Sequence, residues 1–255
     1  MLSKFITILA AASATLAITP PGFEPGTDST LVVTYGNASA EGGNVLERLD
    51  TQSVPKVGTQ SRLEGSSFAV LMVDLDIPTD SPPATNTLLH WLQIGYVQDT
   101  VPVSVNTDSG TANRSAFLFK QPSESPGTAA EYIAPNPPAR IPLSHRYTQI
   151  LIDTSDATPE NLGVLQDAAE TRLGFDVLDV LTKAGLADKV LAANYFNVTN
   201  PGPVESSTNS TSNSTTTDST EESPSATTPP SAASMQTASG MLLSVALAGV
   251  MFLTL

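Results

Sequence analysis

The chain has 255 residues, of which 40% are hydrophobic and 14% charged, and it carries a formal net charge of −14 with no cysteine. The excess of acids excludes a general nucleic-acid binder, because phosphate backbones recruit Lys and Arg, and the sequence has 11 of these against 25 acids. The lack of cysteine excludes a disulfide-bonded scaffold, a Cys-ligated zinc site and a cysteine nucleophile.

Residues 1–17 have the layout of a secretory signal peptide, which is removed from the mature chain. A single basic residue, Lys4, precedes an apolar run that ends in small side chains. Ala12-Ser13-Ala14 provides an A-x-A cleavage motif, and cleavage after Ala17 is the alternative. A buried N-terminal helix is the competing interpretation. We expect the secretory route, so that the folded part begins at residue 18.

Six segments of the folded part are predicted as strands, because they are short, apolar and rich in β-branched or aromatic side chains. They cover residues 31–35, 68–73, 88–94, 116–119, 147–152 and 194–198. Residues 68–73 form an unbroken apolar run, which is typical of a strand buried on both faces. Pro and Gly between these segments indicate turns.

Two helices are predicted late in the folded part. Thr158 is suited to be an N-cap with Pro159 in the first helical position, and this helix would run towards Leu173. A second helix is predicted from the apolar spacing over residues 175–181, and Gly185 is placed to end it. Because strands dominate, residues 18–205 are predicted to form one mainly β, α+β domain.

Residues 206–233 are rich in Ser and Thr and contain no aromatic side chain, so they are predicted to form a disordered, O-glycosylated stalk. Asn-x-Ser/Thr sequons are candidates for N-linked glycosylation of a secreted chain. These sequons begin at Asn37, Asn113, Asn197, Asn209 and Asn213.

Residues 234–255 are predicted to be a signal for attachment of a glycosylphosphatidylinositol (GPI) anchor. Small residues at 231–233 precede a polar spacer and an apolar tail, which is the order that such a signal requires. Ser231 is the first candidate for the attachment residue, and the three residues after it are alternatives. The tail over 241–255 is short for a spanning helix, although a single-span or tail-anchored protein is the competing interpretation. The mature chain would then reach the plasma membrane or the cell wall through a lipid anchor.

The two histidines of the chain are the main candidates for a functional site. His90 lies within one predicted strand, and His145 lies at the start of another. Asp74 and Asp76 follow the most buried predicted strand, where acidic side chains are placed to line a pocket. From spacing alone, the simpler interpretation is that each histidine is a hydrogen-bonded residue of the core.

Motifs around these residues resemble the phosphatidylethanolamine-binding protein family, which is also called the Raf kinase inhibitor protein family. Residues 73–78 (VDLDIP) and His90-Trp91 resemble the family's D-P-D-A-P and H-W motifs. Residues 132–138 (YIAPNPP) and 143–147 (LSHRY) resemble its Y-x-G-x-G-P-P and G-x-H-R-Y motifs. The resemblance covers about residues 30–200. Leu75 replaces a usual proline, and Ala134 and Asn136 replace glycines of the pocket.

The resemblance implies an antiparallel β-sandwich with a small pocket for an anion such as phosphate or a phosphoethanolamine head group. It implies a non-catalytic binding or regulatory protein without metal or cofactor, and an inhibitor of a serine carboxypeptidase is one form of that function. Carried over by position, the pocket would comprise Asp74, Asp76, His90, Pro138, His145 and Tyr147. Strand alternation turns Arg146 to the face opposite His145 and Tyr147, so we interpret it as a structural ion-pair partner.

Two alternatives stay open. The stalk and anchor signal also fit a structural cell-wall glycoprotein with a vestigial pocket. A metal-dependent hydrolase would use the acids and histidines as ligands. A nucleophilic system of Ser144 with His145 is geometrically poor, because adjacent residues of a strand point to opposite faces.

Overall fold

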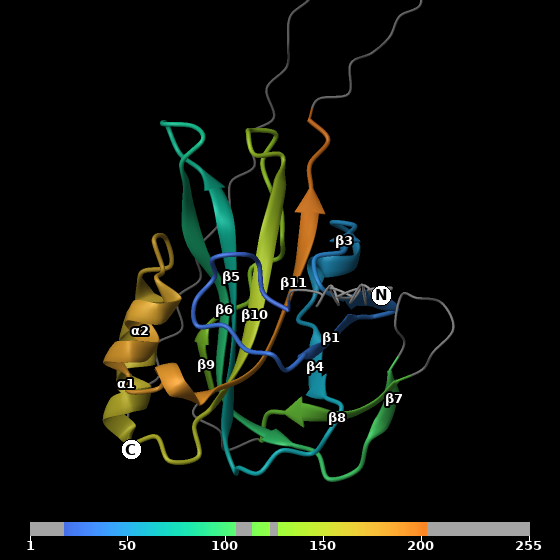
Figure 1. Cartoon of the computed structure of the whole chain (residues 1–255), viewed down its shortest axis with the longest axis vertical. Helices are drawn as coiled ribbons and strands as arrows, with labels where there is room; N and C mark the ends of the chain where they lie inside the picture. The colour runs from blue at the N-terminus through green and yellow to red at the C-terminus, as the bar shows by residue number, and fades with distance from the viewer. Residues whose placement is uncertain (1–17, 106–113, 123–126, 203–255) are drawn as a thin grey trace, which may run out of the picture. The chain divides into compact units, whose positions relative to one another are not determined.

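The computed structural model describes residues 18–105, 114–122 and 127–202 (Figure 1). The strands are β1 (Val32–Tyr35), β2 (Ala38–Ala40), β3 (Val45–Leu46), β4 (Lys56–Thr59), β5 (Phe68–Pro78), β6 (Thr85–Gln98), β7 (Val103–Val105), β8 (Arg114–Lys120), β9 (Gly127–Ala130), β10 (Ser144–Asp153) and β11 (Val190–Thr199). The helices are α1 (Pro159–Glu170) and α2 (Val177–Lys183), with short 3-10 turns at Asp50–Gln52 and Ala187–Lys189.

The described strands form one sheet in the order β2-β1-β4-β8-β6-β5-β10-β11-β3, with β7 paired to β8 and β9 paired to β6. All these pairs are antiparallel except β11 with β3. The two ends of the sheet approach each other, because Thr30, just before β1, forms a bridge with Ala193 of β11. The prediction of a mainly β fold is confirmed, but the sheet is nearly closed on itself instead of forming two separate layers.

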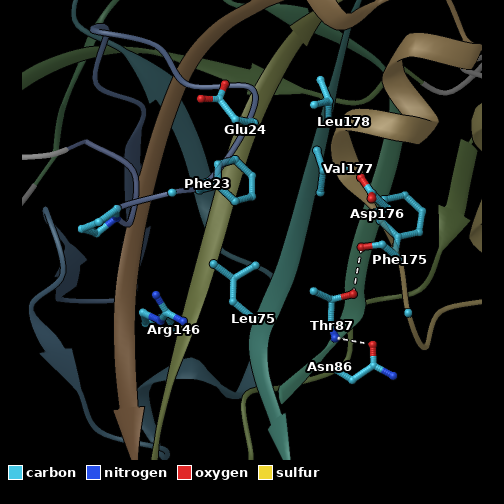
Figure 2. Close-up of a pocket in the computed structure, with 13 residues that line it drawn as sticks. Phe23, Glu24, Leu75, Asn86, Thr87, Arg146, Phe175, Asp176, Val177 and Leu178 are labelled. Atoms are coloured by element: carbon cyan, nitrogen blue, oxygen red, sulfur yellow. Dashed lines mark hydrogen bonds between the residues drawn. The ribbon is translucent and has the colours of Figure 1, made fainter. Parts of the chain in front are cut away.

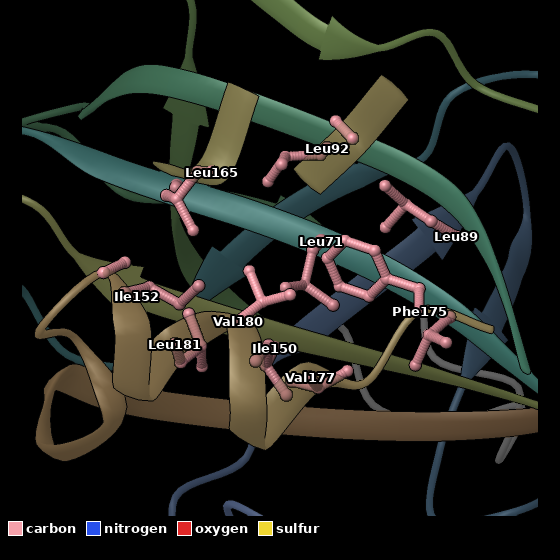
Figure 3. Packing of buried hydrophobic residues seen from close by; sticks show 14 of the residues in the cluster. Leu71, Leu89, Leu92, Ile150, Ile152, Leu165, Phe175, Val177, Val180 and Leu181 are labelled. Carbon is pink, nitrogen blue, oxygen red and sulfur yellow. The ribbon is translucent and has the colours of Figure 1, made fainter. Parts of the chain in front are cut away.

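Strand β5 is apolar on both faces, and each face belongs to a different core. Phe68, Val70 and Met72 belong to an inner cluster that joins β5 to the strands on the far side of the nearly closed sheet. Leu71 and Val73 belong to an outer cluster that also contains residues of both helices. Figure 3 shows this outer layer, in which side chains of the helices pack on β5, β6 and β10. The unbroken apolar run in the sequence therefore reflects a strand that is covered on both sides.

Both helices form where the sequence predicts them. The side chain of Thr158 accepts a hydrogen bond from the backbone of Asn161, whose side chain accepts one in return from Thr158, so α1 begins with a capping box. Helix α2 is N-capped by Asp176 and followed by Gly185, whose φ of 66° is in the left-handed region. Helix α1 ends at Glu170, earlier than predicted.

Gly43 allows the segment before β3 to lie close against β11. Its φ is 88°, and a Cβ atom at this position would lie 2.7 Å from Cε2 of Tyr195. We expect Gly43→Ala to lower the free energy of unfolding by about 1–3 kcal/mol, since it combines backbone strain with overpacking. Urea unfolding measures this change.

Gly22 provides the matched control for that substitution. Its φ of 82° is nearly the same, but an added Cβ would meet nothing within 4 Å. Gly22→Ala should therefore report the backbone strain alone. Equal losses of stability in the two variants would contradict a close contact between Gly43 and Tyr195.

Several predictions from the sequence lie outside the described residues. These are the signal peptide over 1–17, the stalk and anchor signal beyond residue 205, the attachment site Ser231, and the sequons at Asn113, Asn209 and Asn213. Among the described residues, no helix has the length and apolar character needed to cross a membrane.

Candidate functional site

Four of the predicted site residues meet on the inner face of the sheet. Asp74 lies on β5, His90 on β6, and His145 and Tyr147 on β10, and the pairing of these strands places Tyr147 opposite Asp74. All four side chains are buried. We call this group the His–Asp cluster.

The carboxylate of Asp74 is the centre of the His–Asp cluster. Its Oδ2 atom accepts a hydrogen bond from Nδ1 of His145 at 2.8 Å. Its Oδ1 atom accepts one from the backbone N–H of Asp76, also at 2.8 Å. Because Asp74 is only 1% exposed, these bonds replace the hydration that the carboxylate would have in water. The position of the carboxylate therefore fixes the ring orientation of His145.

The other ring nitrogen of His145 is unpaired. Nε2 is buried and has no hydrogen-bond partner among the described residues, and the residue as a whole is 0% exposed. A buried polar atom without a partner is uncommon in folded proteins and calls for an explanation. As an imidazolium next to Asp74, His145 would offer Nε2–H to an anion, and as a neutral ring it would accept a donor.

His90 reaches the same face through a bulge in β6. Met72 pairs with Trp91, whereas Val73 pairs with Leu89, so His90 is the extra residue between them. The bulge allows His90 and Trp91, which are consecutive, both to turn inwards. The ring of His90 packs edge-on against Tyr147, with centroids 5.1 Å apart.

The surroundings of His90 favour its neutral form. Its Nδ1 lies 2.7 Å from the carbonyl oxygen of Ile133, which only accepts, so Nδ1 carries the proton. Its Nε2 lies 3.8 Å from Oδ2 of Asp74. Burial lowers the pKa of His90, and this effect outweighs the hydrogen bond to Ile133 and the charge of Asp74, which act in the opposite direction. His90 is therefore not a positively charged donor at neutral pH.

This lowered pKa gives a pH-dependent contribution to stability. Above a pH of about 6.5, which is the pKa of a histidine in the unfolded chain, His90 is neutral in both the folded and the unfolded state. Its contribution to the free energy of unfolding is then fully present. As the pH falls below about 6.5, the unfolded chain takes up a proton that the folded chain resists. Stability should fall by up to about 1.4 kcal/mol per pH unit until the folded pKa is reached.

Unfolding of the wild type and of His90→Asn across this pH range measures the effect. The asparagine amide is placed to donate to Ile133 as Nδ1 does, but it does not titrate. The difference in stability between the two proteins should narrow as the pH falls. A constant difference between pH 5 and 7 would contradict the lowered pKa of His90.

Tyr147 supplies a hydroxyl donor to the His–Asp cluster. Burial raises the pKa of Tyr147 far above its usual range, and the negative charge of Asp74 raises it further. The phenol therefore stays protonated. Its ring stacks with those of His145 and Phe196, at centroid distances of 6.4 Å and 5.4 Å.

Asp76 is not part of the His–Asp cluster, because both of its carboxylate oxygens accept hydrogen bonds from Arg146. Oδ2 accepts from Nε and from the backbone N–H of Arg146, at 2.7 and 2.8 Å, and Oδ1 accepts from Nη2 at 2.7 Å. The predicted ion-pair role of Arg146 is confirmed, with Asp76 as its partner. The carboxylate of Asp76 thus links the end of β5 to Arg146 of β10. The backbone N–H of Asp76 donates to Asp74 and so contacts the His–Asp cluster.

Arg146 faces the outer side of the sheet, where it lines a pocket of about 550 Å³. Figure 2 shows Arg146 and Leu75 at the sheet, with Phe23 from the N-terminal segment and Phe175 from the segment before α2. No residue of the His–Asp cluster lines this pocket. The two features lie on opposite faces of β10.

Pro138 belongs to an extended segment, residues 131–138, that passes the His–Asp cluster. The segment is joined to His90 twice, through the Nδ1 contact and through the backbone N–H of Ile133, which donates to the carbonyl of His90 at 2.8 Å. Pro138 itself is exposed. Sequence reasoning missed Ile133, because a backbone carbonyl acts here and its side-chain type carries no signal.

Among the ring nitrogens of the His–Asp cluster, Nε2 of His145 is the one that is buried without a hydrogen-bond partner among the described residues. Within residues 18–105, 114–122 and 127–202, the structure contains no group of three or more His, Cys, Asp or Glu side chains placed to hold a metal ion. The predicted absence of a metal stays a prediction.

Comparison with known proteins identifies the family. The model of the family "Phosphatidylethanolamine-binding protein" matches residues 25–196. The chain belongs to this family. The match confirms the resemblance that the motifs of the phosphatidylethanolamine-binding proteins indicate, over nearly the same residues.

Two relatives are similar in sequence. Phomoidride biosynthesis cluster protein N of Talaromyces stipitatus is 29% identical over 213 residues, which cover 77% of this chain and 96% of that protein. Protein FLOWERING LOCUS T of Arabidopsis thaliana is 31% identical over 98 residues, which cover 38% of this chain and 51% of that protein.

Solved structures of the family are more distant. The carboxypeptidase Y inhibitor, solved in complex with its cognate proteinase, is 19% identical with a TM-score of 0.46, over 67% of this chain and 83% of the inhibitor. A phosphatidylethanolamine-binding protein of Plasmodium vivax is 15% identical with a TM-score of 0.45, over 70% of this chain and 91% of that protein.

Proposed function

We propose that the chain is a non-catalytic binding and regulatory protein whose His–Asp cluster holds a small anion. The observation that supports this most strongly is Nε2 of His145, which is buried and unpaired among the described residues. Membership of the phosphatidylethanolamine-binding protein family supports a binding role for the domain. A ligand atom at Nε2 would satisfy the nitrogen and explain why the core tolerates it.

The ligand class follows from the groups around Nε2. Nδ1 of His145 faces the carboxylate of Asp74 at 2.8 Å, so Nε2 is the ring nitrogen left to face a ligand. With a proton on Nε2, the ring would donate to one phosphate group, free or as part of a phosphoethanolamine head group. A chain of net charge −14 repels anions at long range, so binding would depend on this local donor.

Entry of a ligand requires movement of a covering segment, because the side chains of the His–Asp cluster are buried. Residues 131–138 are our candidate for that segment, since the hydrogen bonds of Ile133 place them against His90. Pro138 lies on the exposed side of this segment. It would therefore contact a ligand at the entrance and not at the base of the site.

The location of the protein is part of the proposal. The apolar leader over 1–17 supports a secretory route, and the composition of 206–255 supports a stalk and a GPI anchor at Ser231. A protein displayed in this way would meet a lipid head group or an extracellular peptidase. Inhibition of a serine carboxypeptidase would be an extension of this function. A structural role in the cell wall is the alternative that a binding experiment separates from it.

Native mass spectrometry of the purified full chain tests the proposal. We expect a retained mass that corresponds to a phosphate-containing compound and that disappears on denaturation. Added inorganic phosphate and phosphoethanolamine should compete for the same site. Protein that stays free of ligand in the presence of both compounds would argue for a structural glycoprotein with a vestigial pocket.

A second candidate is catalysis with His145 as a general base. A histidine whose Nδ1 donates to a carboxylate and whose Nε2 is free has the geometry of such a base, and the relative from Talaromyces stipitatus is named for a biosynthesis cluster. The same experiment distinguishes the two functions. A regulatory binder returns its ligand unchanged after long incubation, whereas an enzyme returns a new mass.

A further inference from the structure

The two sequons that the structure describes lie in very different surroundings. Asn37 is exposed in the two-residue turn between β1 and β2, where Tyr35 pairs with Ala38. Asn197 lies inside β11, paired with Arg146 of β10 on one side and Val45 of β3 on the other. From the sequence alone, these two sequons are equal candidates for N-linked glycosylation.

A glycan on Asn197 is incompatible with the folded sheet. Its side-chain Nδ2 donates to the carbonyl of Gly43, and its backbone N–H donates to the carbonyl of Asn44. An N-linked sugar takes one of the two hydrogens of this nitrogen and adds a bulky ring beside it, where the 43–46 segment already lies. Modification would therefore separate the 43–46 segment from β11. Chains modified at Asn197 should fail to fold and should be missing from secreted protein.

Asn37 opens instead onto a shallow cavity of about 520 Å³. Leu49 and Val54 line this cavity together with Asn37, and they are 86% and 51% exposed. Asp50 and Ser53 line it as well and add polar groups. The wall next to the sequon thus combines an apolar surface with hydrogen-bonding groups, as the two chemical faces of a sugar ring require.

We propose that Asn37 carries an N-linked glycan whose first N-acetylglucosamine packs in this cavity against Leu49 and Val54, and that Asn197 is left unmodified. The C–H face of the ring and its acetamide methyl group cover the two aliphatic side chains. The hydroxyl groups of the sugar face Asp50 and Ser53. This inference depends on the proposed secretory route but not on the ligand of the His–Asp cluster.

Secretion from a yeast with high-mannose glycans tests the site assignment. The full chain is placed behind the host's own leader, so that a failure of residues 1–17 as a signal is separated from a failure of this inference. Glycopeptide mass spectrometry should find Asn37 occupied and Asn197 free. An unoccupied Asn37, or a glycan on Asn197 in folded secreted protein, would overturn the assignment.

Thermal unfolding tests the packing of the first sugar. Endoglycosidase H leaves one N-acetylglucosamine on each occupied site, so the trimmed wild type and the trimmed Asn37→Gln variant differ at residue 37 alone. The variant should unfold at a temperature about 2–4 °C lower.

Two controls accompany this measurement. In the Leu49→Ser background the difference in unfolding temperature should shrink, because the apolar contact is already lost. The same pair made in bacteria, without glycans, reports the effect of the substitution on the turn. An equal difference in all three settings would show that the sugar does not pack in the cavity.

Discussion

Arg146→Met should lower the free energy of unfolding by about 3 kcal/mol, the largest stability loss that we expect from a single surface-facing substitution. Asp76 is 6% exposed, and the substitution removes its two charge-assisted bonds from the guanidinium. The carboxylate would then be buried with only the backbone N–H of residue 146 on Oδ2. We place the loss at the lower end for buried ion pairs, because the Arg146 side chain is itself 38% exposed.

The double variant Asp76→Asn with Arg146→Met is the control for that prediction. It removes both charges, so no uncompensated carboxylate is left in the sheet, and it should recover a substantial part of the lost stability. Urea unfolding of the single and double variants gives both values. A double variant that is less stable than Arg146→Met would show that the charge of Asp76 is not what makes the single substitution costly.

His145→Asn should weaken binding of phosphate or phosphoethanolamine by about 10- to 100-fold while the fold is kept. The asparagine amide occupies the place of Nδ1, so it continues to donate to Asp74. It has no atom in the place of Nε2, and the lost bond to a charged ligand is worth about 1.5–3 kcal/mol. Isothermal titration with each compound measures the affinity.

His145→Gln is the matched variant for this experiment. Its amide reaches the place of Nε2 but gives up the bond to Asp74, so it should keep more affinity and lose more stability than His145→Asn. This exchange of effects separates the ligand contact from the structural contact. Unchanged affinity in His145→Asn, with unfolding like that of the wild type, would remove His145 from the binding site.

The long elements could be predicted from the sequence because burial dictates their composition. The apolar run at 68–73 marks β5, and Thr158 with Pro159 marks the start of α1. Strands β2 and β9 were missed, because Ala38-Ser39-Ala40 and Gly127-Thr128-Ala129-Ala130 are short and contain no large apolar side chain. Strands of this kind are held by their neighbours, which a local pattern does not contain.

The candidate site could be predicted in its residue types but not in its arrangement. Strand alternation correctly placed Arg146 opposite His145, because the period of a strand is a local property. The inward orientation of the His90 side chain depends on a bulge opposite Met72 and Val73. No residue type in β6 predicts this bulge. The distinct positions of Asp74 and Asp76 depend on which side chain each meets across the sheet, His145 or Arg146, and this is a property of the fold.

Binding of an anion at Nε2 of His145 is tested most directly by long-range ¹H–¹⁵N NMR of the imidazole rings of the full chain during titration with phosphoethanolamine at neutral pH. We expect a saturable change at Nε2 of His145 and little change at Nδ1, which stays bonded to Asp74. Inorganic phosphate should produce the same change. An Nε2 resonance that does not move at millimolar concentrations of either compound would contradict the proposal that the His–Asp cluster binds an anion.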